Sequence, residues 1–315
     1  MNLPEWRPGH TSGNTPVTSP LTSVWQAERI ALLWLLALAP AVGFAIWQEP
    51  AGWLRTAFLV ALLLQAWQLL FRLMLPPAGA LFSIQDLVHA LLFALLLPVD
   101  FGIREIVFTV SFGSVFGDRL FGGRGFSFLN PVVTGMGFAL FTFSSTSSDI
   151  PLSAVPIAAL LIPAIVLTSV ELISIRTLLG ILASAVFLLA GSPGEAASWQ
   201  LEQSSTLALV ALYLVTDPAA GGSTDASRFA HGLLFGVLAM VLLHADQDVL
   251  AAAINAALLA SLSAPLLDHL VVQMLAYRRG QRLLLQRRAV VDAVMAAGKE
   301  GRSPAAGPER DQADV

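Results

Sequence analysis

The sequence predicts an all-α polytopic membrane protein with about ten transmembrane helices. Apolar residues make up 56% of the 315 residues, charged residues only 12%, and the mean hydropathy is +0.74. Soluble domains average about 25% charged residues, so this chain has too few charges to cover a water-exposed surface. Apolar runs also recur near the roughly 20 residues that cross a bilayer. These observations favour a membrane-spanning bundle over a soluble protein with a large buried core.

Ten apolar segments follow one another within residues 29–270, which we assign to the transmembrane domain. Several are shorter than the roughly 20 residues of a full span, so either flanking turn residues complete them or the helices are broken. The third and eighth segments both end at a proline-containing turn and are each followed by two more segments. Two five-helix halves would then have opposite orientations, which is an inverted 5+5 repeat. The segments are 30–47, 53–75, 84–97, 106–116, 132–143, 155–170, 177–189, 207–215, 229–243 and 249–267.

The arginines of the chain gather on one side of the predicted membrane. Loops after the even-numbered segments carry most of them, whereas loops after the odd-numbered segments are mainly acidic. Because cytoplasmic loops are enriched in arginine and lysine, this asymmetry places both termini in the cytoplasm and supports the count of ten. The arginines after even-numbered segments are Arg72, Arg119, Arg124, Arg176, Arg228, Arg278, Arg279, Arg282, Arg287 and Arg288.

The two ends of the chain lie outside the predicted spans. Residues 1–28 are polar and begin with a stretch rich in proline, glycine, serine and threonine, which predicts a disordered cytoplasmic leader. Residues 271–299 mix a basic face with leucine and valine, as in an amphipathic helix attracted to anionic lipid at the inner membrane surface. An ordinary solvated helix is the alternative. Residues 300–315 predict a disordered tail.

A glycine-rich polar turn at residues 121–131 reads Phe-Gly-Gly-Arg-Gly-Phe-Ser-Phe-Leu-Asn-Pro and runs directly into an apolar segment. Glycines let the backbone turn sharply and approach closely, and Asn130 followed by proline is typical of a helix start. Irregular backbone at the hydrocarbon layer is tolerated only where protein buries it or a polar cavity satisfies it. We therefore predict that this first glycine-rich turn marks a functional centre.

A second glycine-rich turn, residues 216–225, reads Thr-Asp-Pro-Ala-Ala-Gly-Gly-Ser-Thr-Asp and is followed by Arg228. The charge pattern places both turns at the cytoplasmic face. Asp217 could cap a helix that starts at the following proline, so one interpretation is a plain helix-capping turn. The other is that the two turns, each with an arginine, form a cradle for a polar ligand or an aromatic ring system.

These motifs together resemble one family. They are Phe-Gly-Gly-x-Gly with a later Asn-Pro at 121–131, Thr-Asp-Pro at 216–218 with a downstream arginine, and Asn255 followed by Ala-Pro-Leu-Leu-Asp at 264–268. The chain resembles the RnfD/NqrB family, which comprises membrane subunits of the Rnf electron-transport complex and of the sodium-translocating NADH:quinone reductase. The resemblance covers about residues 80–270, and the paired motifs are more specific than either one alone.

The resemblance implies a membrane subunit of a complex that passes electrons from a soluble donor through flavins and couples this to sodium or proton movement. It implies a bacterial inner membrane, with neighbouring membrane subunits that supply iron–sulfur centres and NADH oxidation. The implied cofactor is riboflavin or FMN, bound non-covalently near the two turns, where an arginine could stabilise a reduced flavin anion. The candidate cofactor-binding residues are Gly122, Gly123, Arg124, Gly125, Asn130, Thr216, Asp217 and Arg228.

The sequence departs from the family at the outer loop between the fifth and sixth segments. The family attaches FMN there to a threonine in a Ser-Gly-Ala-Thr-like segment. Here the loop spans only residues 144–151, lacks that segment, and has Thr146 as its one threonine. Thr146 is thus the candidate for covalent flavin, and an ordinary exposed loop is the alternative. We expect a divergent member that retains the scaffold and non-covalent sites.

Two ionisable residues lie within the third segment. Asp86 and His89 are three residues apart, and hence on one face of a helix. Ionisable groups are expensive in lipid, so both side chains should face protein or water, where they could relay protons or bind a cation. The alternative is that Ser83 and Asp86 cap the helix while His89 packs within the bundle.

Other chemistries lack support in the sequence. There are no cysteines and five histidines without ligand-like spacing, so we expect no metal site in this chain. We find no phosphate-binding loop, dinucleotide fingerprint, catalytic triad or nucleic-acid-binding pattern, and do not expect catalysis by this chain alone. A stand-alone transporter or channel for a small solute or ion is the alternative function, since an inverted repeat with broken helices suits it equally well. A purely structural assembly subunit is a third possibility.

Overall fold

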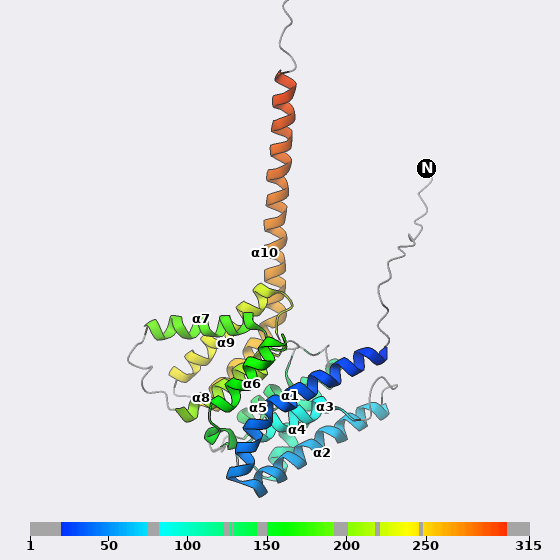
Figure 1. The fold of residues 1–315 in the computed structure, drawn as a ribbon, viewed down its shortest axis with the longest axis vertical. Coiled ribbons are helices and arrows are strands. Elements are labelled where there is room, and N and C mark those ends of the chain that lie inside the picture. The colour runs from blue at the N-terminus through cyan, green and yellow to red at the C-terminus, as the bar shows by residue number, and fades with distance from the viewer. Residues whose placement is uncertain are drawn as a thin grey trace, which may run out of the picture.

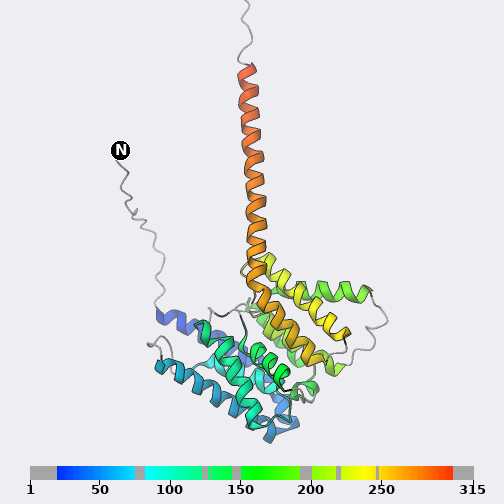
Figure 2. The same cartoon turned by 180° about the vertical axis from the view of Figure 1, so that it is seen from behind.

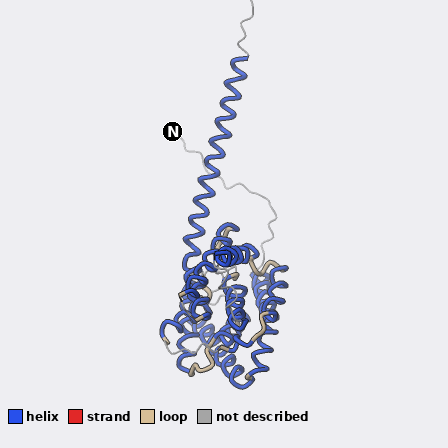
Figure 3. Tube along the Cα trace, turned by 90° about the vertical axis from the view of Figure 1, so that its left-hand side faces the viewer, coloured by secondary structure: helices blue, strands red, loops and turns tan. Residues whose placement is uncertain are grey.

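The computed structural model describes residues 20–74, 82–122, 127, 129–143, 150–191, 201–217, 221–245 and 248–300. This part of the chain is drawn entirely as helix and loop, without a strand (Figure 3), which confirms the predicted all-α class. Ten α-helices form a bundle (Figure 1). They are α1 Pro20–Gln48, α2 Pro50–Met74, α3 Ile84–Leu96, α4 Ile103–Gly117, α5 Pro131–Thr142, α6 Ala158–Ser169, α7 Ile175–Gly191, α8 Leu201–Leu209, α9 Asp225–His244 and α10 Val249–Glu300.

Each of the ten predicted segments contains one of these helices, but the helices differ greatly in length. Four stretches are long and apolar enough to cross a membrane: Glu28–Gln48, Pro50–Met74, Asp225–His244 and Val249–Arg288. In contrast, α3 has 13 residues and α5 and α6 have 12 each. At about 1.5 Å per residue these helices are roughly 20 Å long, which is less than the ~30 Å hydrocarbon layer. The short helices therefore need irregular backbone at their ends.

Two pairs of helices cross at glycines. A Cβ atom added to Gly135 in α5 would lie 2.7 Å from the carbonyl oxygen of Thr109 in α4, and one added to Gly113 would lie 2.9 Å from the Cα of Gly135. In the other pair, a Cβ on Gly180 of α7 would lie 2.7 Å from the amide nitrogen of Leu233 in α9. Small residues at helix crossings let membrane helices gain dispersion contacts. The α4–α5 crossing fixes both ends of the first glycine-rich turn.

Helix α10 extends far beyond the bundle. It begins inside the bundle, changes direction as it leaves, and continues as a single straight helix (Figure 2). Pro265 lies in its bundle section, where the missing amide and the ring favour a bend. Residues 271–299 are thus a helical continuation of the last span, and the side chains described for 271–288 are exposed. That this arm lies on a lipid surface remains a prediction.

The predicted boundaries at the chain ends differ from the observed helices. Helix α1 begins at Pro20, so residues 20–28 of the expected leader are helical. Adding a residue to an existing helix is easier than starting a new one, which allows a span to extend past its apolar core. Residues 1–19 and 301–315 lie outside the described residues. In the bundle, α1 packs against α6 and α5 packs against α10, and the inverted repeat remains a prediction.

Candidate functional site

The first glycine-rich turn is built from the end of α4. After Gly117 the chain forms a short 3-10 helix, η1 (Arg119–Phe121), and then Gly122 adopts φ 102°. This left-handed conformation favours glycine because a Cβ would clash with the backbone. The buried Ser127 hydroxyl bonds the carbonyl of Gly117 and accepts from the amide of Leu129 at 3.2 Å. The turn is therefore closed at its base. Gly123, Arg124 and Gly125 lie outside the described residues.

Asn130 ends the first turn and begins α5. Its Oδ1 accepts from the amide of Val132 at 2.9 Å, so it caps the helix as its position before proline predicts. Its carbonyl oxygen accepts from the hydroxyl of Thr134 at 3.0 Å. Its Nδ2 donates to Oδ2 of Asp217 at 3.3 Å. Only 3% of Asn130 is exposed, so this last contact joins the two turns within the protein.

The second glycine-rich turn follows a change of helix type. Helix α8 ends in a π-helix, η4 (Val210–Val215), which leads directly into Thr216 and Asp217. Single π-helical turns inside α-helices occur frequently at functional sites. The Thr216 hydroxyl donates to the carbonyl of Leu212 at 2.5 Å, and Thr216 is buried. Residues 218–220 lie outside the described residues, and Thr224 then caps α9 by accepting from the amide of Ser227.

Two charged side chains hold the second turn in place. Arg228 donates from Nε to the carbonyl of Gly222 at 3.0 Å, which bends the turn back onto α9. The carboxylate of Asp268 in α10 accepts from the amide of Ser223, with N–O distances of 2.9 and 3.0 Å. Sequence reasoning quoted Asp268 only as part of the family ending and gave it no role. The amide lies 45 residues away along the chain, so no local pattern revealed the contact.

The two turns therefore meet at one place, which we call the junction and define by the contact between Asn130 and Asp217 (3.3 Å). Thr216 is the neighbour of Asp217 in the chain and belongs to the same place. Arg228 lies on the far side of the second turn, half-buried and oriented by Gly222. Proximity of the two turns was the geometric condition for a shared cradle, and the structure meets it.

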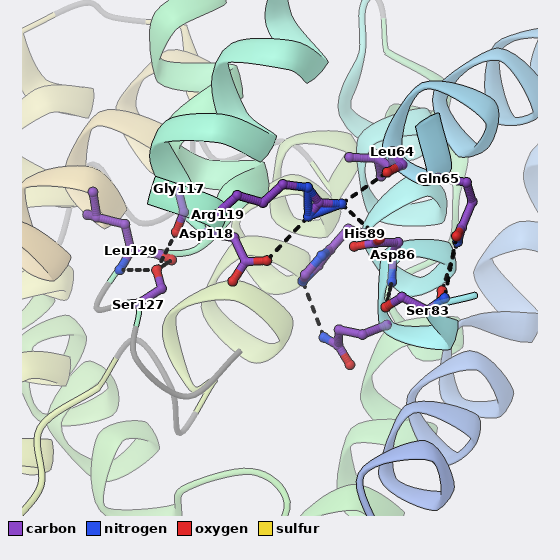
Figure 4. Close-up of polar contacts among 11 residues, drawn as sticks. Leu64, Gln65, Ser83, Asp86, His89, Gly117, Asp118, Arg119, Ser127 and Leu129 are labelled. Carbon is purple, nitrogen blue, oxygen red and sulfur yellow. Dashed lines mark hydrogen bonds and ion pairs between the residues drawn. The ribbon is translucent and has the colours of Figure 1, made fainter. Parts of the chain in front are cut away.

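Asp86 and His89 belong to a separate polar cluster around α3 (Figure 4). The Asp86 carboxylate accepts from Nη2 of Arg119 at 2.9 Å, and both side chains are almost fully buried. Ser83 caps α3 by accepting from the amide of Asp86, and His89 lies 3.2 Å from Nε2 of Gln85. Asp86 is thus paired with a cation of the protein itself. A role of Asp86 and His89 in ion movement remains a prediction.

Arg119 is the residue that sequence reasoning missed. Its position after an even-numbered segment grouped it with the water-exposed cytoplasmic arginines, but only 8% of the residue is exposed. Nη2 also donates to the carbonyl of Leu64 in α2 at 3.0 Å, and Nη1 lies 3.6 Å from a carboxylate oxygen of Asp118 (Figure 4). The one available signal was an aspartate within an apolar segment, because a buried carboxylate requires a cationic partner.

Two further features lie away from the junction. Thr146, the candidate for covalent flavin, falls within residues 144–149, outside the described residues. A cavity of about 490 Å³ lies at the turn between α3 and α4, lined by Asp100 to Glu105 and by Phe143. Among the described residues, no group of three or more histidine, aspartate or glutamate side chains is placed to hold a metal ion.

Comparison with known proteins agrees with the motifs of the two turns. One family model, described as the NQR2, RnfD, RnfE family, matches residues 17–154 and 149–276. The chain belongs to this family. The matched residues include both glycine-rich turns and Asp268, which confirms the resemblance inferred from the sequence. The two matched segments meet at 149–154, directly after the short outer loop in which the sequence departs from the family pattern.

Curated relatives of the chain share one name, the NqrB subunit of the Na(+)-translocating NADH-quinone reductase. The chain is 26% identical over 240 residues to this subunit from Stutzerimonas stutzeri, covering 59% of each chain. It is 27% identical over 238 residues to the one from Ectopseudomonas mendocina, again covering 59% of each. For the subunit from Klebsiella pneumoniae strain 342 it is 24% identical over 251 residues, covering 62% of this chain and 61% of the relative. The chain thus spans about three fifths of these relatives.

Proposed function

We propose that this protein is a membrane subunit of an electron-transport complex of the Rnf or sodium-translocating NADH:quinone reductase type. In this proposal riboflavin or FMN binds non-covalently beside the junction, and electron passage is coupled to movement of Na⁺ or H⁺. The observation that carries the proposal is the contact between Asn130 and Asp217 at 3.3 Å. It brings together two turns whose motifs the family shares, and both turns lie within the matched residues.

The described residues fit a flavin in part. Asn130 and Thr216 use their side-chain donors within the protein, so their role is to build the junction. Arg228 uses Nε for Gly222, which directs its Nη groups as the cationic donors for a ligand. Ser223 is exposed and adds a hydroxyl. A bound flavin would supply the electron-carrying chemistry, and the fixed charge of Arg228 would stabilise negative charge on the reduced ring.

Neighbouring subunits complete the proposed pathway. Iron–sulfur clusters are held mainly by cysteine thiolates, and this chain has no cysteine. Clusters and the site of NADH oxidation would therefore be supplied by other subunits. A partner within the membrane also suits the short helices α3, α5 and α6, whose ends require cover from protein.

The decisive experiment is to purify the protein from cells that make its partners, record its absorption spectrum, and precipitate it with acid. We expect a flavin spectrum whose colour is released into the supernatant. Colour that stays with the denatured chain would show a covalent flavin and direct attention to Thr146. Absence of flavin in the presence of the partners would overturn the redox role.

One structural observation favours the alternative, a stand-alone transporter. Helices α3, α5 and α6 are each too short to span the membrane, and broken helices line the substrate path in inverted-repeat transporters. The purified chain alone, reconstituted in vesicles, would then move a small solute or ion without any flavin. Flux that requires flavin and partner subunits would favour the electron-transport proposal instead.

A further inference from the structure

One buried guanidinium connects three parts of the bundle. Arg119 begins η1, immediately after α4, while its two Nη2 partners are the carbonyl of Leu64 in α2 and the carboxylate of Asp86 in α3. Only 5% of the Arg119 side chain and 6% of the Asp86 side chain are exposed. The start of the first glycine-rich turn is thus bonded to both α2 and α3 (Figure 4).

These contacts need an arginine. The planar guanidinium reaches Leu64 and Asp86 through Nη2 and approaches Asp118 through Nη1 at 3.6 Å. A lysine ammonium is a compact charge on a flexible stem and lacks this fixed fork. A buried charge without its partner is costly, so Arg119 and Asp86 strongly favour the closed arrangement over a separated one.

The first turn is fixed at a second point as well. The Ser127 hydroxyl bonds the carbonyl of Gly117, the last residue of α4, and accepts from the amide of Leu129. Leu129 precedes Asn130, whose Nδ2 reaches Asp217. A continuous series of polar contacts therefore leads from the buried ion pair to the junction. Displacement of Arg119 would release the base of the turn that places Asn130.

We propose that Arg119 is a positioning residue for the junction. Its buried ion pair with Asp86 holds the first glycine-rich turn against α2 and α3, and Asn130 reaches Asp217 as a result. This inference concerns the meeting of the two turns, so it does not depend on whether a flavin binds beside them.

A cross-link between the turns measures this directly. The chain has no cysteine, so Asn130→Cys combined with Asp217→Cys introduces its only two thiols, at side chains that are now 3.3 Å apart. In the full-length protein in membranes, a short bifunctional thiol reagent should link them. The linked fraction is counted as the loss of thiols available to a maleimide mass tag after denaturation.

Three changes in this cysteine-pair background test Arg119. Arg119→Met leaves Asp86 buried without its cation, and we expect a lower melting temperature and a several-fold smaller linked fraction. Asp86→Asn with Arg119→Met removes both charges, and stability should largely return because no charge is left unpaired. The linked fraction should nevertheless stay several-fold below that of the parent. Arg119→Lys keeps the charge but not the fork, and should fall between.

The matched control is Arg176→Met, which breaks the ion pair between Arg176 and Asp225. These side chains are 54% and 62% exposed, and exposed pairs contribute little, so linking should equal the parent. A double variant that regains both stability and full linking would overturn the proposal, because charge compensation alone would then explain the pair. If neither Met variant folds, Arg119→Lys decides: parental linking overturns positioning, and several-fold weaker linking supports it. A parent without flavin affects only the proposed function.

Discussion

Asn130 meets two requirements at once. Its amide supplies an acceptor for the helix cap and a donor for Asp217, and both groups are used. Aspartate would cap α5 equally well but has no donor, whereas serine would cap it but is too short to reach across the junction. The sequence showed the cap because that contact is two residues long. It did not show the donor contact, whose partner is 87 residues away.

Replacing Asn130 by Asp should open the junction. The cap would remain, but a second carboxylate would face that of Asp217 in a buried setting, where an unmatched polar group costs about 1–3 kcal/mol. We expect a lower melting temperature than for Asn130→Ser, which loses the donor without adding a charge. The measurement is thermal unfolding in detergent. Equal stability of the two variants would contradict the role given to the Asp217 contact.

Gly122 should resist substitution for a backbone reason. Its φ of 102° lies in the left-handed region, where a residue with a Cβ is disfavoured by roughly 1–2 kcal/mol. Gly122→Ala should therefore destabilise the protein by about that amount. Gly280→Ala is the control, since Gly280 lies inside helix α10 with open space around it. There alanine should be neutral or stabilising, because it is the better helix former. Similar losses in both variants would count against strain at Gly122.

At the scale of elements, two glycine-lined crossings set the spacing of the bundle. The sequence shows the glycines but not their partners, because helix propensity and hydropathy carry no information on which faces meet. In the structure, α4 and α5 approach so closely that the turn between them must fold back on itself. This explains why Ser127 can reach the carbonyl of Gly117.

Gly135→Ala should force α4 and α5 apart. The added methyl would lie 2.7 Å from a backbone oxygen of Thr109 and 2.8 Å from the ring of Phe93. Overpacking of this kind costs typically 1–3 kcal/mol. Gly43→Ala in α1 is the matched control, because no atom lies within 4 Å of its added Cβ. Thermal unfolding of the two variants provides the test, and a Gly135 variant as stable as the Gly43 variant would show that the crossing is loose.

The helical arm formed by residues 271–300 of α10 should bind anionic lipid. Its basic residues and exposed leucines attract it to a negative membrane surface. For the full-length protein in vesicles, we expect proteinase K to cleave the arm more slowly with anionic than with neutral lipid. Replacement of Arg278, Arg279, Arg287 and Arg288 by Gln should abolish this difference, and Arg104→Gln, which changes an exposed arginine elsewhere, should not. Equal cleavage in both lipids would leave the solvated-helix alternative.

At the scale of the whole molecule, charge and hydropathy set the orientation. The arginine asymmetry places the arm in the cytoplasm and the turn between α3 and α4 outside. Because the chain contains no cysteine, single cysteines can report each side. Tyr277→Cys in the arm should react with a membrane-impermeant maleimide only in inside-out vesicles, and Arg104→Cys only in intact spheroplasts. Both residues are exposed. The reverse labelling pattern would invert the assigned topology and place both turns outside.

The sequence by itself determined the class of the protein, the ten helices, the two glycine-rich turns and the family. These follow from hydropathy, from turn-forming residues and from short motifs, all of which act over neighbouring residues. It did not predict the lengths of the short helices well, because apolar runs continue past the points where tertiary contacts end them.

Tertiary structure alone decided which polar groups meet. Arg119 pairs with Asp86 over 33 residues, Asp268 holds Ser223 over 45, and Asn130 reaches Asp217 over 87. A buried polar group must find a partner, but many partners satisfy the same rule. The close crossing of α4 and α5 and the meeting of the two turns select one set of partners, and this selection turns separate loops into one candidate site.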